Sequence, residues 1–280
     1  MILIAAASVA TISMGLLYKF QRLLIYPSSM NNSREKTDKP SMYGIPFEEN
    51  YLETKDGIKL HSYLMLQNPN SSNYTNKTIV ILCPNAGNIG HSLPIVELFF
   101  KNFGYNVFIY SYRGYGFSTG EPSEMGLKID ADTAMNFLAQ HDQISKSSIF
   151  LYGRSLGGAV AIYIASKNYF NVHGVILENT FINLRACIPH IFPLLSNVAF
   201  LCHDKWDSEK DILQINQEVS VLFLSATDDE IVPPQHMDRL YKVCNSTNKN
   251  IVRFKDSKHN ETVTFPNYWD IIYEFITKSV

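Results

Sequence analysis

The chain has 280 residues, of which 46% are hydrophobic, as expected for one globular domain with a sizeable core. The formal net charge is −2, so the charge balance gives no indication of a nucleic-acid partner. The 4 cysteines are widely scattered with no zinc-type spacing, and we expect buried thiols rather than a disulfide framework or a metal site.

The first element in chain order is an uncharged run from Met1 to Tyr18, which Lys19 and Arg22 close. A helix needs about 17–25 apolar residues to cross a bilayer, and this run lies at the lower end of that range. A cleaved signal peptide is the alternative, but the run lacks a basic start and a clear cleavage site. We expect residues 1–27 to form a single-pass membrane anchor and residues 28–42 to form a polar linker.

Two signals disagree about the side of the membrane on which the rest of the chain lies. Basic residues follow the span at Lys19, Arg22, Arg34, Lys36 and Lys39, and the positive-inside rule then keeps the following domain in the cytosol. Asn-x-Ser/Thr sequons favour the opposite side; they begin at Asn31, Asn70, Asn73, Asn76, Asn245 and Asn260. The sequence leaves the orientation open.

After the linker, the pattern predicts a hairpin and then strands that alternate with helices. An Asp56-Gly57 pair between apolar arms is a strong hairpin signal. Apolar, β-branched runs predict buried parallel strands at 78–83, 105–110, 149–152, 172–177, 220–224 and 250–254. Helical patterns occur at 92–103, 126–141, 159–165, 234–242 and 267–278. This alternation indicates an α/β domain over residues 43–280, with a mostly parallel sheet covered on both faces.

Residues 181–213 interrupt the alternation with two prolines, several aromatic residues and no clean strand. An insertion here would act as a cap over the carboxyl edge of the sheet and would shape an apolar pocket. A plain helical connection is the alternative interpretation.

The stretch around Ser155 carries the clearest chemical signal. The strand predicted at 149–152 runs into Gly153-Arg154-Ser155-Leu156-Gly157-Gly158, and an apolar helix follows. A tight strand-to-helix turn exposes a serine hydroxyl, and small neighbours relieve the crowding. The N–H of Leu156 would stabilise an oxyanion formed there. We predict that Ser155 is the nucleophile of a hydrolase.

A serine nucleophile needs a histidine base and an acid that orients the histidine. His259 follows the last predicted strand, and the chain order serine, acid, histidine is that of α/β hydrolases. The other histidines are expected to pack or to face solvent. The acid should follow the preceding strand, where Asp228, Asp229 and Glu230 stand, and spacing does not choose among them.

A second oxyanion donor should come from the loop after the strand at 78–83. We favour the backbone of Asn85 and Ala86, because small residues let amides approach a substrate oxygen. A second glycine-rich loop, at 113–118, lacks the Gly-Lys-Ser/Thr ending of a phosphate-binding loop. We predict no cofactor and no metal ion.

The chain resembles the bud-emergence (BEM-like) branch of the α/β-hydrolase superfamily, and within it especially the group of α/β-hydrolase domain-containing protein 13 of animals. Besides the serine motif, the similar segments are 17–21, 54–58, 85–91, 112–116, 178–181 and 259–262. The resemblance implies Ser155 as nucleophile and His259 as base. It selects Asp229 as the acid, because the family motif ends in Pro-Pro, as Asp229-Glu230-Ile231-Val232-Pro233-Pro234 does here. The family's His-Gly before Asn-Ala-Gly is replaced by Cys83-Pro84, and proline offers no N–H.

Members of this family are typically anchored in membranes by an amino-terminal segment and include protein depalmitoylases and lipid hydrolases. The resemblance implies a membrane-anchored serine hydrolase that acts on an acylated protein or a lipid. We expect palmitoyl-protein hydrolysis, with lysophospholipase or monoacylglycerol lipase activity as the alternative. A catalytically silent hydrolase fold that serves as a membrane scaffold is the alternative from another class.

Overall fold

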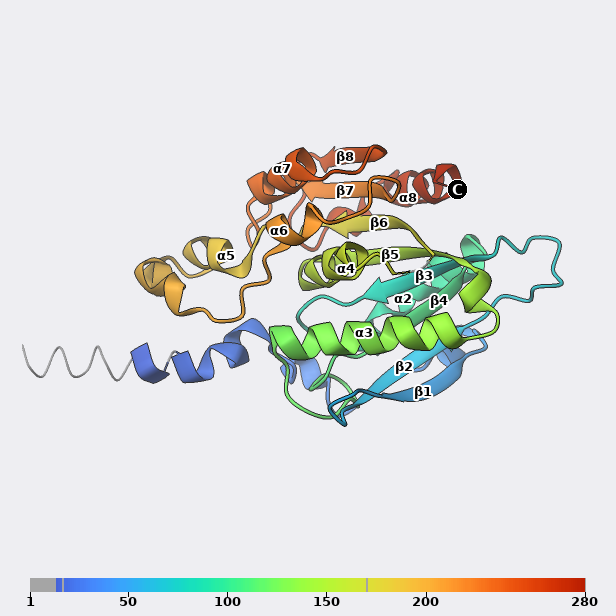
Figure 1. Ribbon diagram of the computed structural model, residues 1–280, viewed down its shortest axis with the longest axis horizontal. Coiled ribbons are helices and arrows are strands. Elements are labelled where there is room, and N and C mark those ends of the chain that lie inside the picture. Colours follow the sequence, from blue (N-terminus) through green and yellow to red (C-terminus); the bar gives the residue numbers. More distant parts are fainter. Residues whose placement is uncertain (1–13, 17, 170, 280) are drawn as a thin grey trace, which may run out of the picture.

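The computed structural model describes residues 14–16, 18–169 and 171–279 (Figure 1). Its central element is an 8-stranded sheet in the order β1-β2-β4-β3-β5-β6-β7-β8. The β1–β2 and β2–β4 pairs are antiparallel, and the other neighbouring strands pair in parallel. The strands are β1 (Glu48–Glu53), β2 (Lys59–Met65), β3 (Lys77–Leu82), β4 (Asn106–Tyr110), β5 (Ser148–Arg154), β6 (Val172–Glu178), β7 (Ser220–Ala226) and β8 (Lys249–Phe254).

Helices cover both faces of this sheet. The row α3, α4, α6 and α7 lies on one face, and α2 and α8 lie on the other (Figure 1). Every residue of β4 and β7 is buried, as strands covered on both sides require. The helices are α2 (Leu93–Glu97), α3 (Glu124–Gln140), α4 (Leu156–Ser166), α5 (Leu184–Ile191), α6 (Ser208–Ile212), α7 (Pro234–Val243) and α8 (Tyr268–Lys278). The predicted α/β architecture is confirmed.

The predicted hairpin turn is also present. Gly57 has φ +79°, a left-handed conformation that favours glycine. Asp56 in this turn accepts a hydrogen bond from Arg113 Nη1 at 2.7 Å, and Arg113 Nε donates to Asp130 at 2.8 Å. Hydrogen bonding to Arg113 lowers the pKa of Asp56 to about 2, whereas burial raises the pKa of Asp130 to about 6. Arg113 therefore ties the hairpin to α3.

One predicted helix is divided in the structure. The helix expected over 92–103 is α-helical only as α2, and the chain then continues as a π turn over Leu98–Asn102. Phe99 in this turn meets Trp269 of α8 edge to face, with ring centroids 5.6 Å apart. The wider turn thus completes the layer that α2 and α8 form.

The anchor predicted over residues 1–27 lies largely outside the described residues. Within the described part, residues 14–16 and 18–25 are helical, and none of the helices found there has the length and apolar character to cross a bilayer. The segment predicted as a linker, 28–42, holds two short 3₁₀ helices at Met30–Asn32 and Pro40–Tyr43. Asn88 Nδ2 donates to the carbonyls of Ser33 and Lys36, both at 2.7 Å. These bonds hold this segment against the sheet domain.

Residues 181–213, which we call the cap segment, contain α5, a 3₁₀ helix η6 (Pro193–Leu201) and α6. The helical residues 18–25, which we call the N-terminal helix, lie beside α5 and η6 at one end of the molecule (Figure 1). Gln21 Nε2 donates to the carbonyl of Leu201 at 3.1 Å. Two segments about 180 residues apart in the chain thus meet beyond the carboxyl edge of the sheet.

Candidate active site

Ser155 stands between the end of β5 and the start of α4. Its backbone has φ +54° and ψ −118°, a conformation that a non-glycine residue keeps only when its surroundings fix it. Two hydrogen bonds do so here. The Ser155 N–H donates to the carbonyl of Glu178 at 2.9 Å, and Thr180 Oγ1 donates to the carbonyl of Ser155 at 2.7 Å.

The glycines around Ser155 are required by close packing. A Cβ on Gly153 would lie 2.2 Å from the carbonyl oxygen of Gly157, and one on Gly157 would lie 2.0 Å from that of Leu82. A Cβ on Gly158 would lie 2.5 Å from the side chain of Thr180. The strand, the turn and the helix therefore approach more closely than side chains allow, as the sequence motif predicted.

His259 and Asp229 form a buried pair. His259 Nδ1 and Asp229 Oδ2 are 2.7 Å apart, and Asp229 Oδ1 accepts from the backbone N–H groups of Ile231 at 2.9 Å and Val232 at 2.7 Å. A carboxylate only accepts, so Nδ1 carries a proton, and in the neutral imidazole Nε2 then holds the lone pair. In this tautomer Nε2 is the nitrogen able to take a proton.

The structure distinguishes the three carboxylates that spacing left open. Asp229 contacts the imidazole ring. Glu230 instead accepts from the backbone N–H of His259 at 3.1 Å, and the Asp228 side chain accepts from Thr227 Oγ1 at 3.4 Å. Only Asp229 among these three has the geometry of an orienting acid.

Asn179 ties the histidine loop to the sheet. Its Nδ2 donates to the carbonyl of His259 at 2.9 Å and to Thr262 Oγ1 at 2.7 Å. Its Oδ1 accepts from the N–H of Ala226, at the end of β7, at 2.8 Å. Asn179 has φ +47°, which asparagine tolerates better than most residues. One side chain at the end of β6 thus connects β7 with the loop that carries His259.

Ser155 and His259 line the same cavity, which has a volume of about 420 Å³. The predicted oxyanion residues Asn85, Ala86 and Leu156 line it as well. Most of the remaining lining is apolar: Leu24, Ile25, Met30, Phe181, Leu184, Ile188, Ile191, Phe192, Ile231 and Val232. The cap segment therefore contributes to a wall of the cavity, as an insertion over the site would.

The loop that contains Asn85 is held by two tyrosines. Tyr115 donates to the carbonyl of Asn85 at 2.9 Å, and Tyr112 donates to the carbonyl of Cys83 at 3.0 Å. The Asn85 side chain donates to the carbonyl of Ile25 at 3.3 Å. The glycine-rich loop at 113–118 thus supports the predicted oxyanion segment.

The other candidate groups have packing roles. All four cysteines are free and buried, and burial raises the pKa of Cys83 to about 11 and that of Cys187 to about 12. Neither thiol is a thiolate nucleophile at neutral pH. His61 is fully buried beside Glu49, at 2.9 Å. His236 packs near Cys187, and burial lowers its pKa.

Known proteins are similar to this chain in sequence. Residues 75–218 match the family described as serine aminopeptidase S33. An uncharacterized membrane protein of Saccharomyces cerevisiae is 49% identical over 269 residues, which cover 96% of this chain and 93% of the yeast protein. Protein bem46 of Schizosaccharomyces pombe is 42% identical over 277 residues, which cover 98% of this chain and 92% of that protein. The chain belongs to the α/β-hydrolase family, in its Bem46-like branch.

Solved structures of other α/β hydrolases share the fold. An α/β hydrolase from Vibrio vulnificus superposes with a TM-score of 0.73 at 20% identity, over 92% of this chain and 93% of that one. An esterase from Pyrococcus furiosus superposes with a TM-score of 0.72 at 18% identity, over 88% of this chain and 96% of that one. At these identities the likeness shows the fold alone.

Sequence reasoning assigned no separate role to two parts of this α/β hydrolase site. Asn179 belongs to the segment 178–181, which was noted only as part of the resemblance. Leu24 and Ile25 were assigned to the anchor, yet they line the cavity. An asparagine directly after a predicted strand is the only sequence signal for Asn179, since asparagine tolerates a positive φ. Nothing local in the sequence signals a wall built from the N-terminal helix.

Proposed function

We propose that this chain is a serine hydrolase that cleaves acyl esters or thioesters through a covalent acyl-enzyme. The observation that carries the proposal is the hydrogen bond between His259 and Asp229, with His259 and Ser155 lining one cavity. A nucleophile, a base and an orienting acid are the groups that acyl transfer needs.

In the proposed reaction, His259 Nε2 takes the hydroxyl proton as Ser155 Oγ bonds to the acyl carbon. The carbonyl π electrons move to oxygen, where the N–H of Leu156 and one from the Asn85-Ala86 segment stabilise the charge. The bond to the leaving thiol or alcohol then breaks, and the leaving group takes the proton from His259. Water repeats both steps on the acyl-enzyme, which releases a carboxylic acid and restores Ser155.

The lining of the cavity favours an aliphatic acyl donor. Among the described residues that line it, none is Asp or Glu, and the one formally charged side chain is that of Arg154. The free amino terminus of a peptide would find no acidic partner there, which disfavours the aminopeptidase activity in the family description. An aliphatic chain, in contrast, gains from leaving water for such a surface.

Our preferred substrate is a palmitoylated protein at a membrane. The yeast relative is named a membrane protein, which supports membrane attachment of this chain. The particular similarity to the group of animal α/β-hydrolase domain-containing protein 13 stays a prediction. Lysophospholipids and monoacylglycerols present the same acyl chemistry to the cavity and are the second candidate class.

Labelling of the full chain with a fluorophosphonate probe tests the proposal. We expect the probe to modify Ser155 and the Ser155→Ala variant to remain unlabelled. Ser72→Ala changes an exposed loop serine and should label like the original protein. If the folded wild-type chain does not react with the probe, the hydrolase proposal fails and the alternative of a catalytically silent membrane scaffold stands instead. A panel of palmitoyl thioesters, lysophospholipids and monoacylglycerols then separates the substrate classes.

A further inference from the structure

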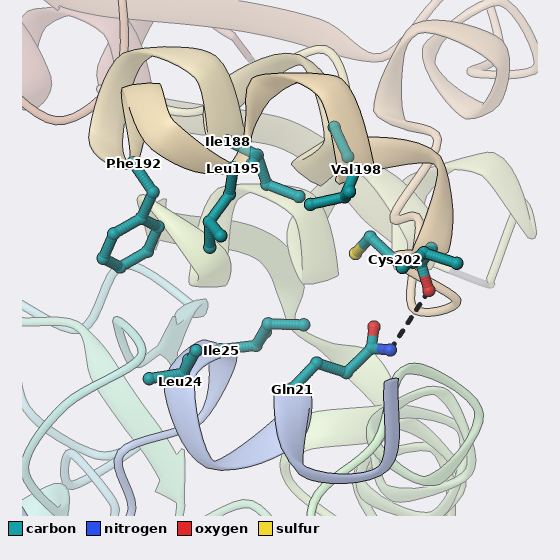
Figure 2. Close-up of a pocket in the computed structure, with 10 residues that line it drawn as sticks. Gln21, Leu24, Ile25, Ile188, Phe192, Leu195, Val198 and Cys202 are labelled. Atoms are coloured by element: carbon teal, nitrogen blue, oxygen red, sulfur yellow. Dashed lines mark hydrogen bonds between the residues drawn. The ribbon is translucent and has the colours of Figure 1, made fainter. Parts of the chain in front are cut away.

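An apolar groove lies between the N-terminal helix and the cap segment, and we call it the helix–cap groove (Figure 2). Leu24 and Ile25 form its helix side. Apolar side chains from α5 and η6 face them across the opening (Figure 2): Ile188, Phe192, Leu195 and Val198. Neither side belongs to the sheet or to the helices that cover it.

The helix–cap groove adjoins the catalytic cavity. Several residues line both spaces: Leu24, Ile25, Ile188, Phe192 and Cys202. A long acyl chain bonded to Ser155 Oγ would therefore meet, at the side of the cavity next to the groove, apolar side chains that both spaces share.

The polar side chain at the groove already has its partners. Gln21 is the one amide among the described lining residues. Its Nε2 donates to the carbonyls of Leu201 at 3.1 Å and Tyr18 at 3.0 Å, and its Oε1 accepts from the N–H of His203 at 2.9 Å. A ligand with hydroxyl groups or charges would lose its hydration in the groove without replacement. A hydrocarbon chain pays no such cost.

The helix side of the groove is fixed to the cap side. Arg22 Nε lies 3.3 Å from Asp204 Oδ2, and Trp206 Nε1 donates to Tyr26 Oη at 2.9 Å. Tyr26 and Trp206 are fully buried. These contacts make the N-terminal helix a part of the site's wall rather than a free tether.

We propose that the helix–cap groove, with a volume of about 60 Å³, binds the far end of the acyl chain of the substrate, so that the N-terminal helix helps to set the chain length that the enzyme accepts. This inference rests on the proposed function and assigns the acyl site within it. The occupant is the unbranched hydrocarbon of a long-chain acyl group whose carbonyl lies at Ser155.

Two matched pairs of variants of the full chain test the assignment. On the cap side, Leu195→Trp fills the groove, and Leu194→Trp is its control because Leu194 is 98% exposed. On the helix side, Leu24→Trp fills the groove, and Leu23→Trp, at a residue that does not line it, is the control. The readout is the second-order rate at which ethyl and hexadecyl fluorophosphonates modify Ser155.

We expect Leu195→Trp to slow the hexadecyl reagent by about tenfold or more, a typical effect of altered apolar fit, while the ethyl reagent reacts as before. Leu24 also lines the catalytic cavity, so for Leu24→Trp we expect the ratio of the hexadecyl rate to the ethyl rate to fall by about tenfold or more. Both controls should react like the original protein with either reagent. Equal effects on the two reagents, or none, would overturn the groove assignment and leave the hydrolase proposal standing. An effect confined to Leu195→Trp would show that the N-terminal helix takes no part in binding the acyl chain. Failure of every reagent to modify the wild-type chain would instead overturn the hydrolase proposal.

Discussion

The nucleophile turn and the helix–cap groove meet at one cavity but are stabilised by different kinds of contact. Around Ser155, buried hydrogen bonds of Thr180 and Asn179 connect the ends of β5, β6 and β7 with the loop that carries His259. Along the groove, apolar side chains face an opening, and the polar contacts gather around Gln21 and Arg22. Proton transfer needs fixed atoms, whereas an aliphatic chain needs only space and the exclusion of water. The hydrogen-bonded part of the site is thus built on the sheet, and the apolar part on the N-terminal helix and the cap segment.

The largest effect on stability should come from Gly157→Ala, which crowds the turn that carries Ser155. The new Cβ would lie 2.0 Å from the carbonyl oxygen of Leu82, so β3 or α4 must move. We expect the free energy of unfolding to fall by about 3 kcal/mol or more, measured by urea denaturation. Gly15→Ala is the control, because no atom of the described residues lies within 4 Å of a Cβ at Gly15. Equal stability of the two variants would contradict the close packing.

Asn179→Asp tests whether the polar contacts position His259. The substitution keeps the shape but replaces an N–H₂ donor with an oxygen that faces the carbonyl oxygen of His259, which can only accept, and Thr262 Oγ1, whose hydroxyl would have to turn to donate. We expect the ethyl fluorophosphonate to react about tenfold or more slowly, since loss of such bonds costs about 1–3 kcal/mol.

The pH profile separates positioning from general damage in this variant. A protonated aspartic acid regains one donor, so the rate relative to wild type should recover as the pH is lowered. The ratio of hexadecyl to ethyl rates should stay unchanged, because the groove is untouched. A constant relative rate across pH would argue for a merely structural role.

Tyr26→Phe loosens the contact between the N-terminal helix and the cap segment. The change leaves Trp206 Nε1 without its partner in a buried position, at a cost of about 1–3 kcal/mol. We expect faster hydrogen exchange over residues 18–25 and an unchanged rate with the ethyl reagent. Tyr51→Phe, at an exposed tyrosine, should change neither. Slower reaction with the ethyl reagent would show that the two regions are coupled.

The smallest effect should lie far from both regions, at Asp56. Arg113 lowers the pKa of this carboxylate to about 2, so its stabilisation is present above about pH 4 and is lost as the pH falls towards 2. The Asp56 side chain is 39% exposed, and solvent screening limits the contribution to less than about 1 kcal/mol. Asp56→Asn should lower stability slightly at pH 7 and approach wild type at pH 2, as urea unfolding at both pH values would show.

Most of the fold could be predicted from the sequence because its signals are local. Buried parallel strands are short apolar runs, and the observed bounds of β3, β6 and β7 lie within two residues of those expected. The hairpin followed from Asp56-Gly57. The π turn after α2 was not foreseen. Phe99 in this turn contacts Trp269, far along the chain, and such a contact leaves no local signal.

The candidate site was predictable in part for the same reason. Ser155 and His259 follow recognisable strands, and the structure brings them to one cavity. Spacing did not choose the orienting acid among Asp228, Asp229 and Glu230. The choice depends on which of these carboxylates the backbone turns toward the imidazole of His259. The contacts of Asn179 and of the N-terminal helix join segments about 50 to 180 residues apart, and no local pattern encodes such pairings.

The buried contact between Tyr26 and Trp206 has a practical consequence for the preparation of this protein. A shortened protein that starts after the N-terminal helix would keep the sheet and Ser155 but would lack the helix side of the helix–cap groove. Under the proposed acyl assignment, such a preparation would lose its discrimination between short and long acyl chains, and its substrate preferences would differ from those of the full chain.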